Sequence, residues 1–134
     1  MPVYKLNKIK DGADYVNEEG AIVENTKLTF DPEPSLSYAY CSDTMYYPAL
    51  CDFIKDVDLL YHEATFANDC EDLAKKTKHS TAEQAALIAK KADVKMLMLG
   101  HYSARYPDLK LLLDEAKLVF ENTVLADDGL KINL

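Results

Sequence analysis

The sequence predicts a layered α/β domain, because short apolar segments that suit β-strands alternate with segments of helical periodicity. Three of the apolar segments, over residues 38–41, 59–61 and 94–99, run directly into polar side chains. Open α/β sheets bind their ligands just outside the ends of the strands. We therefore expect the polar residues that follow these segments to meet at one site.

Residues 1–36 lack a hydrophobic periodicity that would support a core of their own. Residues 15–16 and 21–23 flank a turn-like group at 17–20, which suits a small β-hairpin. The prolines of residues 31–34 then interrupt regular structure. We expect 1–36 to be a loop-rich arm on a main α/β domain formed by 37–134.

Helices are expected between the apolar segments of this main domain. Pro48 suits the first turn of a helix whose apolar stripe continues to Ile54. Residues 69–75 suit a short helix that ends in lysines. Ser80 and Glu83 match a capping box, which predicts the start of the next helix.

The last part of the chain is expected to contain a further helix and a terminal hairpin. Pro107 is expected to open the helix. Residues 123–125 and 131–134 flank an Asp-Asp-Gly turn at 127–129, which predicts the hairpin. The sequence alone leaves the strand order open.

Composition and charge restrict the classes of partner. The net charge of −8 argues against a broad basic face for phosphate backbones, so any main grip on nucleic acid must come from outside this chain. No apolar run is long enough to span a bilayer and the first residues lack a signal-peptide core, so we expect a cytoplasmic location. Cys41, Cys51 and Cys70 match no zinc spacing and are interpreted as buried or half-buried apolar residues.

The three histidines, His62, His79 and His101, each lie at a predicted element boundary. A single histidine at such a place is usually a hydrogen-bonded structural residue, and three together favour chemistry. If the loops meet, Glu63 is a candidate partner for His79, and the pair would form a general acid held by an orienting carboxylate.

Asp43 has two interpretations, as a cap for the helix near Pro48 or as a carboxylate metal ligand. His101 is the better metal ligand candidate, because Gly100 before it permits close backbone approach. Arg105 suits a phosphate or carboxylate contact, or equally a surface ion pair. On these grounds the residues indicate an α/β domain with a candidate partial metal site.

Four motifs taken together resemble those of ribonuclease Z, the tRNA 3′-processing endonuclease family of the metallo-β-lactamase superfamily. They are YCSDT at 40–44, LYHEATF at 60–66, KHSTAEQ at 78–84 and LGHYSARY at 99–106. The resemblance implies the C-terminal half of a metallo-β-lactamase-type αββα sandwich, with a mixed sheet covered by helices. It also implies hydrolysis of one phosphodiester bond to remove the 3′ trailer of precursor tRNA.

The resemblance implies a role for each candidate residue. Asp43 matches the aspartate that bridges two zinc ions, and His101 matches a histidine ligand of one of them. His79 matches the proton donor to the leaving 3′-oxygen, with Glu63 orienting it. Arg105 matches an arginine that helps to hold phosphate or to fix its loop, and His62 gives structural support.

The sequence also departs from the family's pattern. The main metal motif, H-x-H-x-D-H, the further histidine after it and the protruding arm that grips tRNA are absent from these 134 residues. We therefore expect this chain to be the C-terminal portion of a ribonuclease Z and to be inactive alone. The alternatives are a non-catalytic fragment that self-associates as a homodimer, or another phosphodiesterase of the metallo-β-lactamase type.

Overall fold

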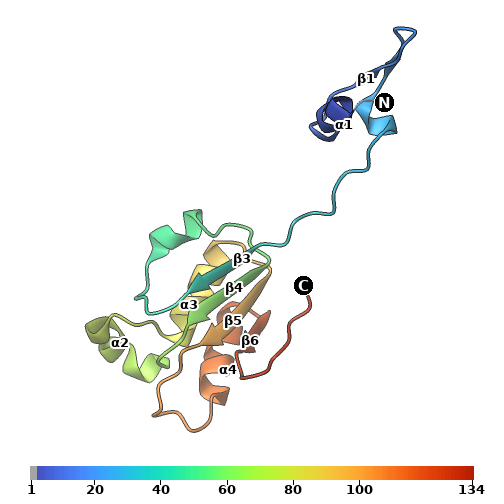
Figure 1. Cartoon of the computed structure of the whole chain (residues 1–134). Helices are drawn as coiled ribbons and strands as arrows, with labels where there is room; N and C mark the ends of the chain where they lie inside the picture. The colour runs from blue at the N-terminus through green and yellow to red at the C-terminus, as the bar shows by residue number, and fades with distance from the viewer. Residues whose placement is uncertain (1–2) are drawn as a thin grey trace. The chain divides into compact units, whose positions relative to one another are not determined.

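The computed structural model describes residues 3–134 and divides the chain into two compact units, one up to Ser35 and one from Leu36 to Leu134 (Figure 1). The larger unit carries the sheet with its helices. Among the described residues, no helix combines the length and the apolar character that crossing a membrane requires.

The smaller unit contains a helix, α1 (Val3–Lys10), and an antiparallel hairpin of β1 (Tyr15–Val16) and β2 (Ile22–Val23). The hairpin lies where the turn residues indicated one. A short 3₁₀ helix, η1 (Asn25–Lys27), follows. The Asn25 amide donates to the carbonyl oxygens of Ile9 and Ala13, at 2.6 and 3.0 Å. The bond to Ile9 reaches α1 from outside the helix, so the weak local pattern of residues 5–10 did not predict α1.

The larger unit is built on a four-stranded sheet in which every neighbouring pair is parallel. Its strands, β3 (Tyr38–Cys41), β4 (Leu59–Glu63), β5 (Met96–Gly100) and β6 (Thr123–Leu125), lie side by side in sequence order. The expected α/β class is confirmed, although the resemblance implied a mixed sheet and the observed pairs are all parallel. Right-handed crossovers between parallel strands that follow one another in this order place the connections on one face.

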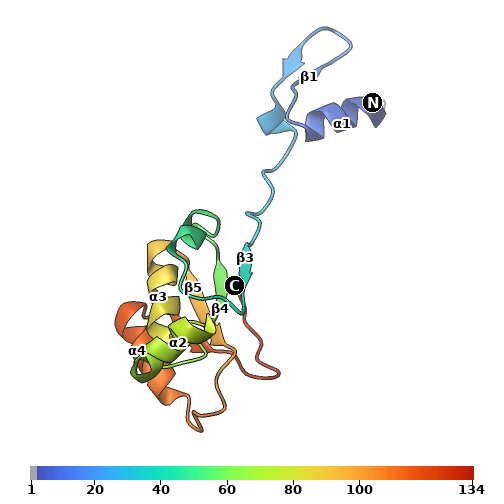
Figure 2. The same cartoon turned by 90° about the vertical axis from the view of Figure 1, so that its left-hand side faces the viewer.

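The connecting helices lie on that face, as Figure 2 shows for α3 and α4. They are η2 (Pro48–Asp52), η3 (Asn68–Cys70), α2 (Glu71–Thr77), α3 (Ala82–Lys91) and α4 (Lys110–Val119). The core lies between α3, α4 and the sheet. It contains the buried strand leucines Leu60, Leu97 and Leu99, together with Ile88, Leu112 and small alanines of α3 that allow close packing.

The opposite face of the sheet carries large side chains that remain exposed. Tyr38 and Tyr40 are 55% and 63% exposed. Tyr40 stacks on Tyr61 of β4 with 4.5 Å between the ring centroids, and Met98 of β5 is next to Tyr61 in register. This open sheet face, defined by Tyr38, Tyr40, Tyr61 and Met98, is therefore rich in aromatic and apolar surface.

Helix α3 begins one residue later than the sequence indicated. Its N-cap is Thr81, whose hydroxyl accepts from the Gln84 N–H, while the Gln84 side chain accepts from the Thr81 N–H. The predicted capping box of Ser80 with Glu83 is wrong by this one position. The physical reason is that the Ser80 N–H donates to Glu63 instead, at 3.0 Å.

The prediction of a terminal hairpin is also wrong. The strand at 123–125 exists as β6, but it pairs in parallel with β5 and residues 131–134 form no strand. Residues 127–130 do form a turn, closed by the Leu130 N–H donating to the Asp127 carbonyl at 3.0 Å. The helix expected from Pro107 begins at Lys110, and the helix expected at 48–54 is the shorter η2.

The cysteines follow the expectation. Cys51 is buried, and Cys41 and Cys70 are half-buried. All three are free within the described part of the chain, and burial raises the pKa of the Cys41 and Cys51 thiols.

Candidate functional site

The parallel sheet brings the ends of its strands to one edge. Asp43 follows β3 by two residues, Glu63 is the last residue of β4, and His101 directly follows β5. His79 reaches the same place from the turn between α2 and α3. The structure therefore brings together the four residues whose convergence the sequence predicted.

Asp43, His79 and His101 form a compact group of potential metal ligands. One ligand atom from each lies within 4.8 Å of the others. His101 Nε2 is 3.3 Å from Asp43 Oδ1, and the His79 and His101 rings stack with centroids 5.3 Å apart. The Asp43 and His101 side chains are 72% and 42% exposed, so a ligand from solvent can reach them.

The backbone turns sharply at both strand ends that carry this group. Asp43 has φ +48° and His101 has φ +58°, in the left-handed region that costs a non-glycine residue about 1–3 kcal/mol. Gly100 before His101 leaves room for the Tyr61 side chain, because a Cβ atom there would lie 2.1 Å from the Tyr61 hydroxyl oxygen. Such strained positions concentrate at functional sites.

Glu63 is the buried support of the group. Its side chain is fully buried and accepts from the Thr44 and Ser80 N–H groups, at 2.9 and 3.0 Å. It also lies 2.7 Å from His79 Nδ1. An ionised carboxylate only accepts hydrogen bonds, so His79 donates from Nδ1 and keeps Nε2 free for chemistry. The expected pairing of Glu63 with His79 is thus present in the structure.

His62 lies apart from the group. It is fully buried and shares a face of β4 with Leu60, pointing into the helix-covered core. Its Nδ1 is 2.8 Å from the Glu63 carbonyl oxygen, and its Nε2 has no hydrogen-bond partner in the part of the chain that the structure describes. Burial lowers the pKa of His62 and keeps the ring neutral.

Arg105 lies beside the group and contacts it only indirectly. Its Nη1 is 3.4 Å from Cys70 Sγ, and its guanidinium is 5.6 Å from the Phe66 ring centroid. The Phe66 ring in turn meets His79 edge-on at 6.3 Å. No ion pair joins Arg105 to a carboxylate within residues 3–134.

Sequence reasoning missed two residues of the site. The Thr65 hydroxyl is 2.7 Å from Glu63 Oε2 and 2.9 Å from His101 Nδ1. The Ser80 hydroxyl donates to the Thr44 carbonyl at 2.7 Å and so holds the loop that carries Asp43. Both residues lie within the motifs that resemble the family, HEAT at 62–65 and HST at 79–81, and this was the one sign of a role in the site. The sequence did not show what their hydroxyls contact.

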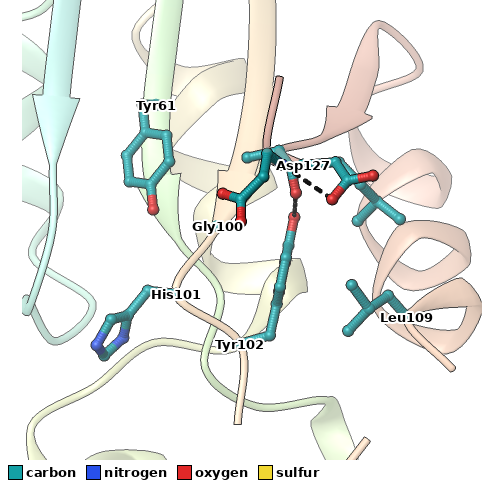
Figure 3. Close-up of a pocket in the computed structure, with 9 residues that line it drawn as sticks. Tyr61, Gly100, His101, Tyr102, Leu109 and Asp127 are labelled. Atoms are coloured by element: carbon teal, nitrogen blue, oxygen red, sulfur yellow. Dashed lines mark hydrogen bonds between the residues drawn. The ribbon is translucent and has the colours of Figure 1, made fainter. Parts of the chain in front are cut away.

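Two pockets flank the group. One of about 610 Å³ lies beside His101 and is lined by Tyr61, Tyr102 and Asp127 among others (Figure 3). Burial raises the pKa of Tyr102 to about 12, and its hydroxyl contacts the carbonyl oxygens of Leu99 and Ala126. A second pocket of about 430 Å³ lies beside His79 and includes Tyr46.

The donor set fits a metal of the zinc type. One carboxylate and two imidazoles are typical zinc ligands, and a catalytic zinc takes about three protein ligands. The hydrogen bond from His79 Nδ1 to a buried carboxylate is the support that metal-site histidines usually have. A site with two ions needs more ligands than these three residues offer.

No family model matches the chain. A ribonuclease Z of Bacteroides fragilis is 52% identical over all 134 residues, which make up 44% of that protein. A ribonuclease Z of Phocaeicola vulgatus is 53% identical over the whole chain and 43% of its own length. The chain thus spans less than half the length of these curated relatives, in agreement with the expected C-terminal portion.

Two solved structures share this fold over part of their length. The metallo-β-lactamase fold protein YhfI from Bacillus subtilis matches 72% of this chain and 39% of its own, at 30% identity and a TM-score of 0.67. A long form RNase Z from yeast matches 68% of this chain and 12% of its own, at 31% identity and a TM-score of 0.61. The chain is therefore a homologue of part of ribonuclease Z, and its fold matches part of the metallo-β-lactamase fold.

Proposed function

We propose that this chain is the C-terminal part of a zinc-dependent endoribonuclease that removes the 3′ trailer of precursor tRNA by hydrolysing one phosphodiester bond. The observation that carries the proposal is the meeting of Asp43, His79 and His101 above the buried Glu63. The relatives named ribonuclease Z supply the reaction and the substrate. A cytoplasmic location would suit this substrate.

In this proposal Asp43 and His101 hold metal. The Asp43 side chain is 72% exposed, so its carboxylate would be accessible to zinc once ligands from outside this chain are present. Zinc would supply Lewis acidity and activation of water. Because this chain supplies too few ligands for two ions, it should be inactive alone and bind zinc weakly.

His79 is the proposed proton donor to the leaving 3′-oxygen. Glu63 fixes the ring through Nδ1, which leaves Nε2 as the end that faces the substrate. Arg105 is proposed to hold its loop through Phe66 and Cys70 and to offer its exposed charge to phosphate. His62 is proposed to support the strand from inside the core.

The test is cleavage of precursor tRNA by the 134-residue chain and by a longer polypeptide that adds the H-x-H-x-D-H segment. We expect cleavage only by the longer polypeptide. In it, His79→Ala should lower kcat about 10²- to 10⁴-fold, while Lys76→Ala on the exposed surface of α2 should have little effect. Cleavage by the short chain at a rate near that of the longer one would contradict the proposal.

The same longer polypeptide separates the proposal from another phosphodiesterase activity. It should hydrolyse precursor tRNA far more efficiently than a small phosphodiester such as bis(p-nitrophenyl) phosphate. The reverse preference would favour a phosphodiesterase of the metallo-β-lactamase type that acts on small esters.

The open sheet face supports a second candidate, a fragment that self-associates. Tyr38 and Tyr40 are more than half exposed there, and such surface tends to be covered by another chain. A homodimer in which two copies bury this face is therefore the proposed alternative for the chain in isolation.

A further inference from the structure

We propose that Thr65 is a positioning residue whose hydroxyl connects Glu63 to His101 and fixes the protonation pattern of the His101 ring. In this arrangement His101 carries its proton on Nδ1 and turns the lone pair of Nε2 toward Asp43. The inference deepens the proposed function, since it rests on the metal role of His101. Its first test needs neither metal nor activity.

The geometry places the Thr65 hydroxyl between the two groups. Thr65 is 7% exposed, and its Oγ1 is 2.7 Å from Glu63 Oε2 and 2.9 Å from His101 Nδ1. The third neighbour is the His101 carbonyl oxygen at 3.0 Å. The hydroxyl has one proton to donate, so the ability of each neighbour to donate or accept a hydrogen bond decides which of them receives that proton.

Glu63 determines the direction of that donation. Three backbone N–H groups, those of Thr44, Thr65 and Ser80, point at its carboxylate, an environment that suits an ionised acceptor. A carboxylate 2.7 Å from a hydroxyl oxygen must receive the hydroxyl proton, because two acceptors would otherwise face each other at that distance. The Thr65 proton therefore belongs to Glu63.

The remaining bond then defines the His101 ring. With its proton committed to Glu63, the Thr65 oxygen can only accept from His101, so His101 Nδ1 carries the hydrogen at 2.9 Å. Nε2 is left unprotonated. It and Asp43 Oδ1, 3.3 Å apart, are then two acceptors that a cation between them would join. A neutral imidazole with its other nitrogen hydrogen-bonded is the form that binds metal.

One buried carboxylate thus orients both imidazoles. Glu63 Oε1 accepts directly from His79. Glu63 Oε2 accepts from the Thr65 hydroxyl, whose oxygen in turn accepts from His101 Nδ1. The proposed proton donor and the proposed metal ligand therefore share a single support.

The test compares Thr65→Val, which keeps the shape but removes the hydroxyl, with Thr65→Ser, which restores it. The ring ¹⁵N chemical shifts are measured in the 134-residue chain at about pH 8.5, above the reference pKa of imidazole. We expect His101 to be protonated at Nδ1 in the unaltered chain and in Thr65→Ser. In Thr65→Val a substantial fraction should move to the Nε2-protonated form.

A matched control separates this effect from a loss of packing. Thr123 is also buried, and its hydroxyl donates to the Phe120 carbonyl oxygen away from the site. Thr123→Val should leave the His101 shifts unchanged. Nε2 protonation in the unaltered chain would overturn the proposal without any variant, and so would unchanged His101 shifts in Thr65→Val.

A second readout is zinc affinity. Changes to groups that support a metal ligand usually cost about 10- to 100-fold in affinity, and we expect such a loss in Thr65→Val, little in Thr65→Ser and none in Thr123→Val. Equal zinc affinity in the unaltered chain and the three variants would argue against the positioning role of Thr65. Failure of the longer polypeptide to cleave precursor tRNA would refute the proposed function but leave the ring measurement intact.

Discussion

At the scale of single residues, the site depends on one buried carboxylate rather than on its exposed ligands. Glu63 is fully buried and receives hydrogen bonds from three backbone N–H groups, the Thr65 hydroxyl and His79. These donors come from three separate loops. The carboxylate therefore connects the loops that carry Asp43 and His79 to the end of β4.

His62 differs from the other histidines, because its environment is apolar and the pKa of its ring is lowered by burial. The unfolded chain takes up a proton at this position near its ordinary pKa of about 6.5, and the folded chain does not. The unfolded state then binds more protons, so the free energy of unfolding should fall as the pH drops below about 6.5, by at most about 1.4 kcal/mol per pH unit from this group.

His62→Leu should therefore give a flatter dependence of the unfolding free energy on pH between about pH 6.5 and 5. Urea unfolding at several pH values measures the two slopes. His79 and His101 are present in both proteins, so the difference in slope reports on position 62. Identical slopes would show that His62 is protonated in the folded state.

The residues predicted from the sequence to converge do so, because the parallel sheet aligns the strand ends that carry them. The contacts of Thr65 and the isolation of His62 were not predictable in the same way. Both depend on which face of β4 a side chain occupies and on what lies across from it. Residue types and spacing do not specify those contacts.

At the scale of elements, the start of α3 shows how the site and the helix use neighbouring residues. The Ser80 N–H donates to Glu63, and the cap passes to Thr81 with Gln84. The sequence offers two capping boxes, because both Ser80–Glu83 and Thr81–Gln84 have suitable residue types. Only the buried acceptor near Ser80 decides between them.

Single alanine variants distinguish the two boxes. Thr81→Ala should lower the free energy of unfolding by about 1–2 kcal/mol, and Gln84→Ala by a smaller amount. Glu83→Ala should change it by no more than about 0.5 kcal/mol, since Glu83 takes no part in the cap. Urea unfolding followed by far-UV circular dichroism provides the measurement. A larger cost for Glu83→Ala than for Gln84→Ala would restore the box that the sequence suggested.

The strands were predictable because their apolar runs are short, clear and bounded by polar residues. Helix α1 was not predictable, since a bond from Asn25 to Ile9 supports it. The expected terminal hairpin failed for a related reason. The strand at 123–125 has a long-range partner, β5, which the local turn signal at 127–129 could not reveal.

At the scale of the whole molecule, the sequential parallel order leaves one sheet face open. This face carries Tyr38, Tyr40, Tyr61 and Met98. If two copies cover it in solution, light scattering should give a mass near twice 15.1 kDa.

Tyr40→Glu should then shift the chain toward the monomer, because a carboxylate would be buried at the interface. The matched control is Leu118→Glu, which changes an 88% exposed residue of α4. A monomer at high concentration in the unaltered chain would remove the case for self-association.

The proposed site requires Asp43 and His101 to hold metal at the edge of the sheet, with His79 beside them as the proton donor. The most direct measurement is a zinc titration of the 134-residue chain followed by ¹H–¹⁵N NMR. We predict weak binding that shifts the His101 ring nitrogens and the amides near Asp43, is lost in Asp43→Asn and persists in Asp128→Asn. Shifts confined to other parts of the chain, or equal binding by both variants, would contradict the account.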